Sequence, residues 1–333
     1  MKYPVLVGKI GSMLSDLLDD EDYDDLISAG SIPEIASVLR KKGYGDFIPD
    51  IEDIHRRDLE SFVQRKFYSV LRSLKVYVSY PEKKLLELVG FRCELDILKK
   101  VFRIFSAGEE FDERFLVCEP GFDPHDLLSS RSTDELIGKL SNRPYYSILS
   151  GFVGKDMFGT GELENALDIW YFSKLHRVIK STGSKRILEF FEKQIDLLNL
   201  LWIYRGRFLF GYSPEVVLNY TIPFGRHVKS ATLSAFTDSS TPEEFLERLG
   251  ATPYSEIIHE TENVPLEFVM DRLFTGYLFR EARRMASNFL DGFEMLVGFI
   301  HLLEYEIRNI TTVVETVRYS LGVEMSRSYI IRG

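Results

Sequence analysis

Three acidic residues lie at corresponding positions of repeated, apolar, helix-forming stretches. They are Asp96, Asp196 and Glu306, and each lies in a segment with helical periodicity. Such carboxylates can line a polar inner surface that binds a partner through charge. On an outer helix face they would instead pair with a nearby arginine or lysine, and the sequence leaves both interpretations open. It does not favour catalysis, because three equivalent positions give no reason for one to differ chemically.

Other patterns that carry chemistry are missing from the sequence. The histidines are scattered and show no HExxH or paired spacing, and the two cysteines form no CxxC pair, so a metal site is not expected. A phosphate-binding glycine loop and a GxSxG nucleophile elbow are also absent. We therefore expect no cofactor, no metal and no enzymatic activity.

A recurring phrase predicts how the long helices are connected. It begins with a hydroxyl residue followed three places on by Glu, which is the capping box of a helix N-terminus. A Leu follows five residues after the Glu, a Tyr five residues later and an aliphatic residue four residues after that. The phrases align without a gap and run from Ser31 to Ile48, from Ser132 to Leu149 and from Thr241 to Ile258. Three copies in register indicate a triplicated unit.

The order of elements predicts an all-α fold in which the three units close on one another. Pairs of long helices with three- and four-residue spacing define repeat 1 at 51–150, repeat 2 at 151–262 and repeat 3 at 263–333. The capped helix follows the long pair in the first two repeats, but the chain ends after the third pair. Residues 1–50 should therefore supply the helices that complete the third repeat. We expect a funnel with pseudo-threefold symmetry.

Composition narrows the possible partners. The chain has 333 residues and a net charge of −10, which argues against nucleic acid as a partner. Cys93 and Cys118 are too few for a disulfide framework, and reduced cysteines are the simpler expectation. The most apolar stretch, Met295 to Leu303, is far shorter than the roughly 20 residues that span a bilayer. We therefore expect no transmembrane segment.

Three basic clusters occur at comparable places of the repeats despite the acidic total. They cover residues 65–75, 174–186 and 280–284. They are either solvated faces that balance the acidic runs or a basic rim that docks an acidic or lipid-proximal partner.

Several motifs together resemble a known family. These are the three capped phrases, the stretch from Phe191 through Asp196 and Asn199 to Arg205, and Glu306-Ile307-Arg308-Asn309 near the end. The chain resembles the C subunit of the archaeal and bacterial V/A-type ATPases, whose eukaryotic counterpart is the d subunit of the vacuolar ATPase. The resemblance spans the whole chain, although this sequence has Ile310-Thr311-Thr312 where many members of the family are more apolar or basic.

The resemblance implies a non-catalytic rotor part. Such a protein sits on the membrane rotor ring, receives the central-shaft subunits D and F in its cavity, and transmits torque between them. Its location would be cytoplasmic, peripheral at the membrane through the ATPase complex. The candidate residues for the shaft and cavity interface are Asp96, Asp196, Asn199, Arg205, Glu306, Arg308 and Asn309. The alternative function is a helical scaffold or adaptor that binds another partner in its central cavity.

Overall fold

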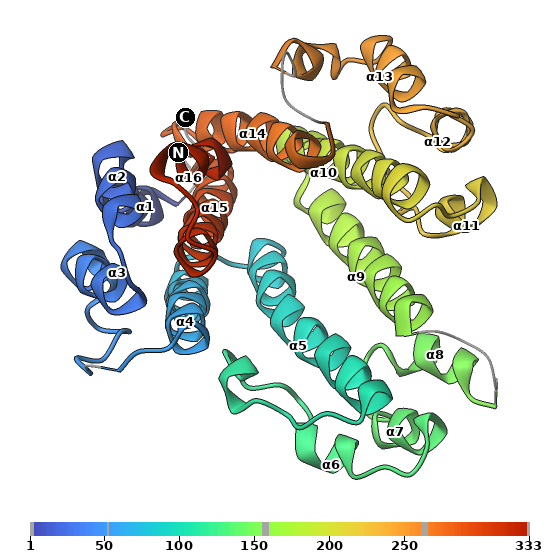
Figure 1. The fold of residues 1–333 in the computed structure, drawn as a ribbon, viewed down its shortest axis with the longest axis horizontal. Coiled ribbons are helices and arrows are strands. Elements are labelled where there is room, and N and C mark those ends of the chain that lie inside the picture. The colour runs from blue at the N-terminus through green and yellow to red at the C-terminus, as the bar shows by residue number, and fades with distance from the viewer. Residues whose placement is uncertain (1–2, 52, 155–159, 261–265, 332–333) are drawn as a thin grey trace. The chain divides into compact units, whose positions relative to one another are not determined.

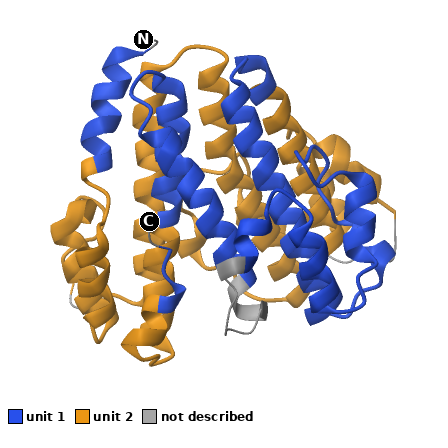
Figure 2. Cartoon of the chain, turned by 90° about the horizontal axis from the view of Figure 1, so that it is seen from above, with its two compact units in different colours: residues 1–14, 179–305, 328–333 blue, residues 15–178, 306–327 orange. Residues whose placement is uncertain are grey.

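The computed structural model describes residues 3–51, 53–154, 160–260 and 266–331, and every regular element within these ranges is a helix (Figure 1). The expected all-α class is therefore confirmed. The chain divides into two compact units, which Figure 2 distinguishes by colour. Unit 1 comprises Met1–Leu14, Ile179–Tyr305 and Ser328–Gly333, and unit 2 comprises Ser15–Val178 and Glu306–Arg327. Each unit thus combines segments that are distant in sequence.

Unit 2 contains the two short helices that follow α1 (Pro4–Ser15), the first long pair and the last part of helix α15 (Gly292–Arg318). Its helices are α2 (Asp20–Ser28), α3 (Ile32–Leu39), α4 (Arg56–Leu74), α5 (Glu82–Ala107), α6 (Pro124–Leu128), α7 (Thr133–Lys139), α8 (Tyr146–Leu149) and most of α9 (Thr160–Thr182). A π-helical turn at Arg40–Tyr44 and short 3₁₀ turns at Lys75–Tyr77, Glu113–Phe115 and Ser150–Phe152 connect them.

Unit 1 contains the second long pair's later helix and the shorter helices that follow it. Its helices are most of α1 (Pro4–Ser15), α10 (Lys185–Tyr204), α11 (Pro214–Asn219), α12 (Ser230–Thr237), α13 (Pro242–Gly250), α14 (Leu266–Ala286) and the first part of α15 (Gly292–Arg318). A π-helical turn at Arg205–Leu209 extends α10, and a 3₁₀ helix covers Ser255–Glu260. The last helix, α16 (Val323–Tyr329), belongs to unit 2 up to Arg327 and to unit 1 from Ser328.

The three predicted capping phrases begin helices α3, α7 and α13. Ser31, Ser132 and Thr241 each accept a hydrogen bond from the backbone amide three residues later, over 3.2–3.4 Å. The glutamate at that position reaches back to the amide that precedes the cap, as Glu244 does to Ser240 N over 2.8 Å. These bonds satisfy amides that the first helical turn leaves without partners, so local sequence determines where each helix begins.

Helices α14 and α15 approach each other closely at a glycine within unit 1. A Cβ atom at Gly298 would lie 2.3 Å from the Ala286 amide nitrogen and 2.6 Å from the Ala282 carbonyl oxygen. Only a residue without a side chain lets the two backbones meet there. Phe279 of α14 packs edge-on against Tyr305 of α15, with ring centroids 5.5 Å apart.

Length and polarity decide whether a helix can cross a bilayer. Among the helices described, none combines the required length with sufficient apolar character.

Candidate functional site

The tyrosine of each repeated phrase donates a hydrogen bond to a buried carboxylate. The Tyr44 hydroxyl donates to Glu306 Oε1 over 2.6 Å, Tyr145 to Glu94 Oε1 over 2.9 Å, and Tyr254 to Asp196 Oδ2 over 2.7 Å. All three tyrosines are completely buried. The carboxylates lie in the middle of the long helices α15, α5 and α10. We call each tyrosine–carboxylate pair an anchor.

The same three carboxylates also receive backbone amides from a loop. Glu306 Oε2 accepts from Leu18 N over 2.6 Å, and Glu94 Oε2 accepts from Gly121 N over 2.9 Å. Asp196 accepts from His227 N and Val228 N over 2.7 and 3.1 Å. In each case the loop leads into a short helix that precedes the capped helix. Each carboxylate therefore holds both ends of a two-helix segment.

We call these two-helix segments heads. They are α2–α3 on α15, α6–α7 on α5 and α12–α13 on α10. In the third, Phe236 of α12 and Phe245 of α13 pack with ring centroids 4.9 Å apart. Because one carboxylate accepts from a tyrosine beyond the head and from an amide before it, the head cannot shift without breaking charge-assisted hydrogen bonds.

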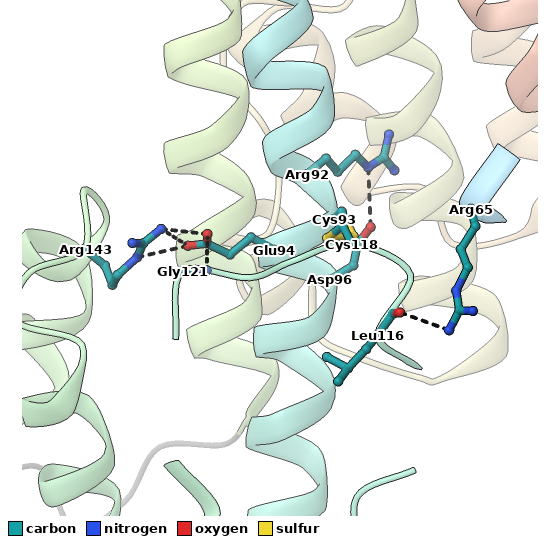
Figure 3. The surroundings of a disulfide bond; sticks show 9 residues. All are labelled: Arg65, Arg92, Cys93, Glu94, Asp96, Leu116, Cys118, Gly121 and Arg143. Atoms are coloured by element: carbon teal, nitrogen blue, oxygen red, sulfur yellow. Dashed lines mark hydrogen bonds and ion pairs between the residues drawn. A yellow bond between two sulfur atoms is a disulfide. The ribbon is translucent and has the colours of Figure 1, made fainter. Parts of the chain in front are cut away.

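The anchors differ in how their negative charge is compensated. Glu94 pairs with Arg143, whose Nη2 lies 2.6 Å from each carboxylate oxygen (Figure 3). Glu306 lies 3.5 Å from Lys66 Nζ, which also sits 3.5 Å from the centre of the Tyr44 ring. Asp196 receives its bonds from Tyr254 and the two backbone amides.

Burial shifts the protonation of these groups. It raises the pKa of the Glu306 carboxyl, opposed by Lys66 and the hydrogen bonds, and it lowers the pKa of Lys66. Burial likewise raises the pKa of Asp196, while its hydrogen bonds to Tyr254 and the backbone act in the opposite direction. The pKa of Tyr254 is raised by burial and then by the neighbouring Asp196 charge. The tyrosines therefore remain hydrogen-bond donors at neutral pH.

The expected equivalence of Asp96 with Asp196 and Glu306 is wrong. The Asp96 side chain is 49% exposed and lies 4.0 Å from Arg92 Nε, one helical turn away. Glu94 occupies the buried position instead. Two residues along an α-helix correspond to roughly 200° of rotation, so a two-residue error in the alignment moves a side chain to the opposite face. Asp96 is an exposed helix-surface charge, which was the other interpretation of the sequence.

The remaining candidates fall into buried and exposed groups. Asn199 is fully buried and binds Ile222 twice, accepting from its amide over 2.7 Å and donating to its carbonyl over 2.8 Å. Asn309 is also buried. Arg205 is partly exposed, 3.8 Å from Asp271 Oδ2, and Arg308 is exposed. Asn199 thus fixes the stretch that leads to the third head.

Two residues of the second anchor, Glu94 and Arg143, are not among the candidates that the sequence indicates. Glu94 and Arg143 carried no distinctive spacing, although Arg143 lies only two residues before the repeated Tyr145. Gly121 and Gly225 are features of the sequence that could have indicated where a loop meets an anchor. A Cβ at Gly121 would lie 2.1 Å from Arg143 Nη1, and one at Gly225 would lie 2.1 Å from Asp196 Oδ1. Both mark places where the loop approaches its anchor too closely for a side chain.

The two cysteines form a disulfide bond, which corrects the expectation of reduced cysteines. Cys93 of α5 bonds to Cys118, with Cα atoms 6.4 Å apart (Figure 3). Cys93 precedes Glu94, and Cys118 lies three residues before Gly121. The disulfide and the Gly121–Glu94 hydrogen bond therefore fix the same loop to the same helix. The number of cysteines does not reveal this bond, because it forms through the proximity of Cys93 and Cys118 in the folded chain.

Comparison with known proteins places this helical arrangement in a family. Residues 6–329 match the family described as ATP synthase (C/AC39) subunit, so the match includes all three anchors. The chain belongs to this family. As an ATP synthase (C/AC39) subunit, it is a structural component of a rotary ATP synthase and not its catalytic part. The resemblance inferred from the motifs is thereby confirmed.

Individual members of the A-type ATP synthases are similar over nearly the whole chain. The C subunit of the A-type ATP synthase of Methanocaldococcus jannaschii is 23% identical, with 99% of this chain and 86% of the relative covered. The corresponding protein of Methanothermobacter thermautotrophicus is 22% identical, covering 93% and 82%. That of Methanococcoides burtonii is 22% identical, covering 99% and 94%.

Proposed function

We propose that this chain is the rotor part that links the central shaft of an A-type ATP synthase to its membrane ion-carrying ring and transmits torque between them. Membership of the ATP synthase (C/AC39) subunit family carries the proposal. The relatives are C subunits of A-type ATP synthases, and they cover almost all of this chain. In this role the protein is held at the membrane through the complex.

The anchors support a mechanical role. A part that transmits torque must resist deformation, and long packed helices supply stiffness along their axes. The heads add a second constraint, because each is fixed to the middle of a helix by two or more hydrogen bonds to one buried carboxylate. Charge-assisted bonds in a buried setting are stronger than neutral ones, so these joints oppose sliding of a head along its helix.

The proposal includes the threefold arrangement and the predicted repeats at residues 1–50, 51–150, 151–262 and 263–333. Three observations within the units support it. Each repeat has one anchor, each anchor joins a head to a long helix, and the head formed by α2 and α3 is joined to α15, a helix of the third repeat. The hydrogen bonds of Tyr44 and Leu18 to Glu306 make this last connection.

For the shaft interface, we propose the exposed members of the candidate set. Asp96, Arg205 and Arg308 present charges that contacts with the shaft subunits D and F can use. The buried members, Asp196, Asn199, Glu306 and Asn309, would act indirectly by holding the helices in place. Contacts made through exposed charges give specificity and fast association, and they weaken as salt screens them.

A binding experiment with both partners tests the function. The immobilised chain should capture the D–F pair and, separately, the membrane ring of the same complex. Reversing Arg205 and Arg308 to Glu should weaken D–F capture and reduce its salt dependence, while Arg131→Glu, on the second head, serves as the control. Failure to capture either partner would contradict the proposed role.

A further inference from the structure

Two of the basic clusters in the sequence meet within unit 1. The second cluster ends at the turn between α9 and α10, and the third lies in the last part of α14, just before the turn to α15. Arg186 Nη1 of α10 lies 3.5 Å from Glu294 Oε2 of α15, so the two turns are neighbours. Both turns belong to unit 1. We call the surface formed by residues 180–186 and 283–294 the basic tip.

The carboxylates of the basic tip are engaged within the protein. Glu294 accepts from Asn288 Nδ2 over 2.8 Å and also pairs with Arg186. Asp291 accepts from the amides of Phe293 and Glu294 over 2.9 and 3.2 Å, and thereby caps the start of α15. Both negative charges are thus compensated by groups of the same two turns.

Three cations of the basic tip have no such compensation. Lys180, Lys185 and Arg283 are exposed, and in the described part of the chain no carboxylate pairs with them. The acidic and basic residues of unit 1 nearly balance, so most of the net charge of −10 arises in unit 2. The basic tip is therefore locally positive although the chain as a whole is acidic.

Two adjacent apolar side chains protrude from the turn between α14 and α15. Phe289 is 55% exposed and Leu290 is 82% exposed. Hydrogen bonds hold the turn that presents them, since Asp291 N donates to Asn288 O over 3.2 Å and Leu290 N donates to Asn288 Oδ1 over 3.3 Å. A supported turn loses less conformational entropy when it binds a partner.

Protruding apolar side chains beside uncompensated cations are complementary to an anionic membrane surface. Lysine and arginine are attracted to the lipid phosphates, while phenylalanine and leucine enter the boundary between head groups and acyl chains. A protein partner would need a pocket shaped for Phe289 and Leu290, whereas a lipid surface admits both side chains without one. The combination of charge and apolar exposure therefore favours lipid.

We infer that the basic tip binds directly to the anionic head groups of a lipid membrane. This contact goes beyond the proposed function, because it requires neither the shaft nor the membrane ring. It also decides between the two interpretations of the second and third basic clusters, which become a docking surface and not merely solvated faces.

Binding of the full chain to lipid vesicles tests the inference. Vesicles that contain phosphatidylglycerol in phosphatidylcholine are compared with vesicles of phosphatidylcholine alone, by co-sedimentation at low and at high salt. The chain should bind the anionic vesicles about tenfold or more tightly. Salt should weaken this binding, because it screens the attraction between the cations and the phosphates. No binding, or equal binding to both kinds of vesicle, would overturn the inference.

Matched variants locate the binding surface. Two variants change the basic tip, one by removing its apolar side chains and one by removing two charges, namely Phe289→Ser/Leu290→Ser and Lys180→Gln/Lys185→Gln. Two controls change exposed residues of the same kinds elsewhere in unit 1, namely Phe210→Ser/Val216→Ser and Lys9→Gln/Lys229→Gln. Because all the replaced side chains are exposed, each variant should melt at the wild-type temperature.

Each basic-tip variant should bind the anionic vesicles about tenfold or more weakly than the wild type, and each control should bind like the wild type. Tip variants that bind as tightly as their controls would overturn the inference. Loss of D–F or ring capture by the tip variants, with unchanged vesicle binding, would assign the tip to a protein partner and reject the inference. Capture of D–F and of the ring is measured separately, so a failure to bind lipid leaves the proposed function standing.

Discussion

Tyr254 donates its hydroxyl hydrogen to Asp196 over 2.7 Å, and both side chains are completely buried. The two residues belong to different elements of unit 1, and the bond closes the third head onto α10. Two loop amides complete the acceptor set of the same carboxylate. The strength of this joint can be measured directly, because one atom can be removed without changing the shape of the ring.

Tyr254→Phe should lower the free energy of unfolding by about 1.5–3 kcal/mol, the range for a hydrogen bond to a charged group. The cause is loss of one donor to a buried carboxylate. Urea unfolding followed by circular dichroism provides the measurement. Tyr80→Phe is the control, since Tyr80 is largely exposed and should change nothing. A Tyr254→Phe protein as stable as the control would mean that the anchor contributes no stability.

The pH dependence of stability should show that the folded protein binds the proton of the Asp196 carboxyl more tightly than the unfolded chain does. Burial raises the pKa of this carboxyl above its ordinary value of 3.8, so the folded protein holds the proton more tightly than the unfolded chain does. The resulting stabilisation is complete below the unfolded-state pKa and is lost as pH rises through the folded-state pKa. Asp196→Asn has no such proton.

The stability of the wild type relative to Asp196→Asn should therefore fall as pH rises above 3.8. Urea unfolding of both proteins at several pH values gives this difference, in which titrations far from the site cancel. A difference that instead grows with pH would show that the folded-state pKa is lowered and that hydrogen bonds outweigh burial.

Gly225→Ala should disturb the third anchor. The added methyl group would lie 2.1 Å from Asp196 Oδ1 and 3.0 Å from the Val228 carbonyl oxygen, so the loop must move away from the carboxylate. We expect a loss of about 1–3 kcal/mol, as for overpacking in a well-filled site. Thermal melting measures it.

Gly90→Ala is the matched control for that substitution. Nothing lies within 4 Å of a Cβ at Gly90, which is inside helix α5. Alanine there should stabilise the protein by about 0.5–1 kcal/mol, because it restricts the unfolded chain and favours the helix. Equal effects of the two substitutions would refute the close approach at Gly225.

Reduction of the Cys93–Cys118 bond should destabilise unit 2. The bond spans 25 residues of sequence, and opening a loop of that size costs about 3 kcal/mol. Comparing melts with and without reductant measures the loss. The Cys93→Ser/Cys118→Ser double variant should melt like the reduced protein and ignore the reductant. Two thiols that react readily in the native, non-reduced protein would contradict the bond.

The sequence predicted the elements better than their pairing. Three- and four-residue spacing revealed the long helices, and the capping residues located the starts of α3, α7 and α13 because those interactions are local. The repeat also placed Tyr44, Tyr145 and Tyr254 at corresponding positions. What a tyrosine bonds to depends on a helix distant in sequence, and no local rule specifies it.

Asp96 and Glu94 show why the site was harder to predict. Both are acidic residues in one helix, and the approach of Tyr145, Arg143 and Gly121 to Glu94 distinguishes their faces. The Cys93–Cys118 bond was missed for a related reason, since the helix and the loop that it joins meet only in the folded chain. Composition and periodicity do not contain such distances.

The first anchor imposes an order on synthesis. Tyr44 and Glu306 are separated by 262 residues, and Leu18 and Glu306 by 288. A ribosome adding roughly 5–20 residues per second needs roughly 13–52 s to make the chain between Tyr44 and Glu306. Throughout that interval the first head lacks the carboxylate that will hold it. Of the three heads, the first to be made is thus the last to be secured.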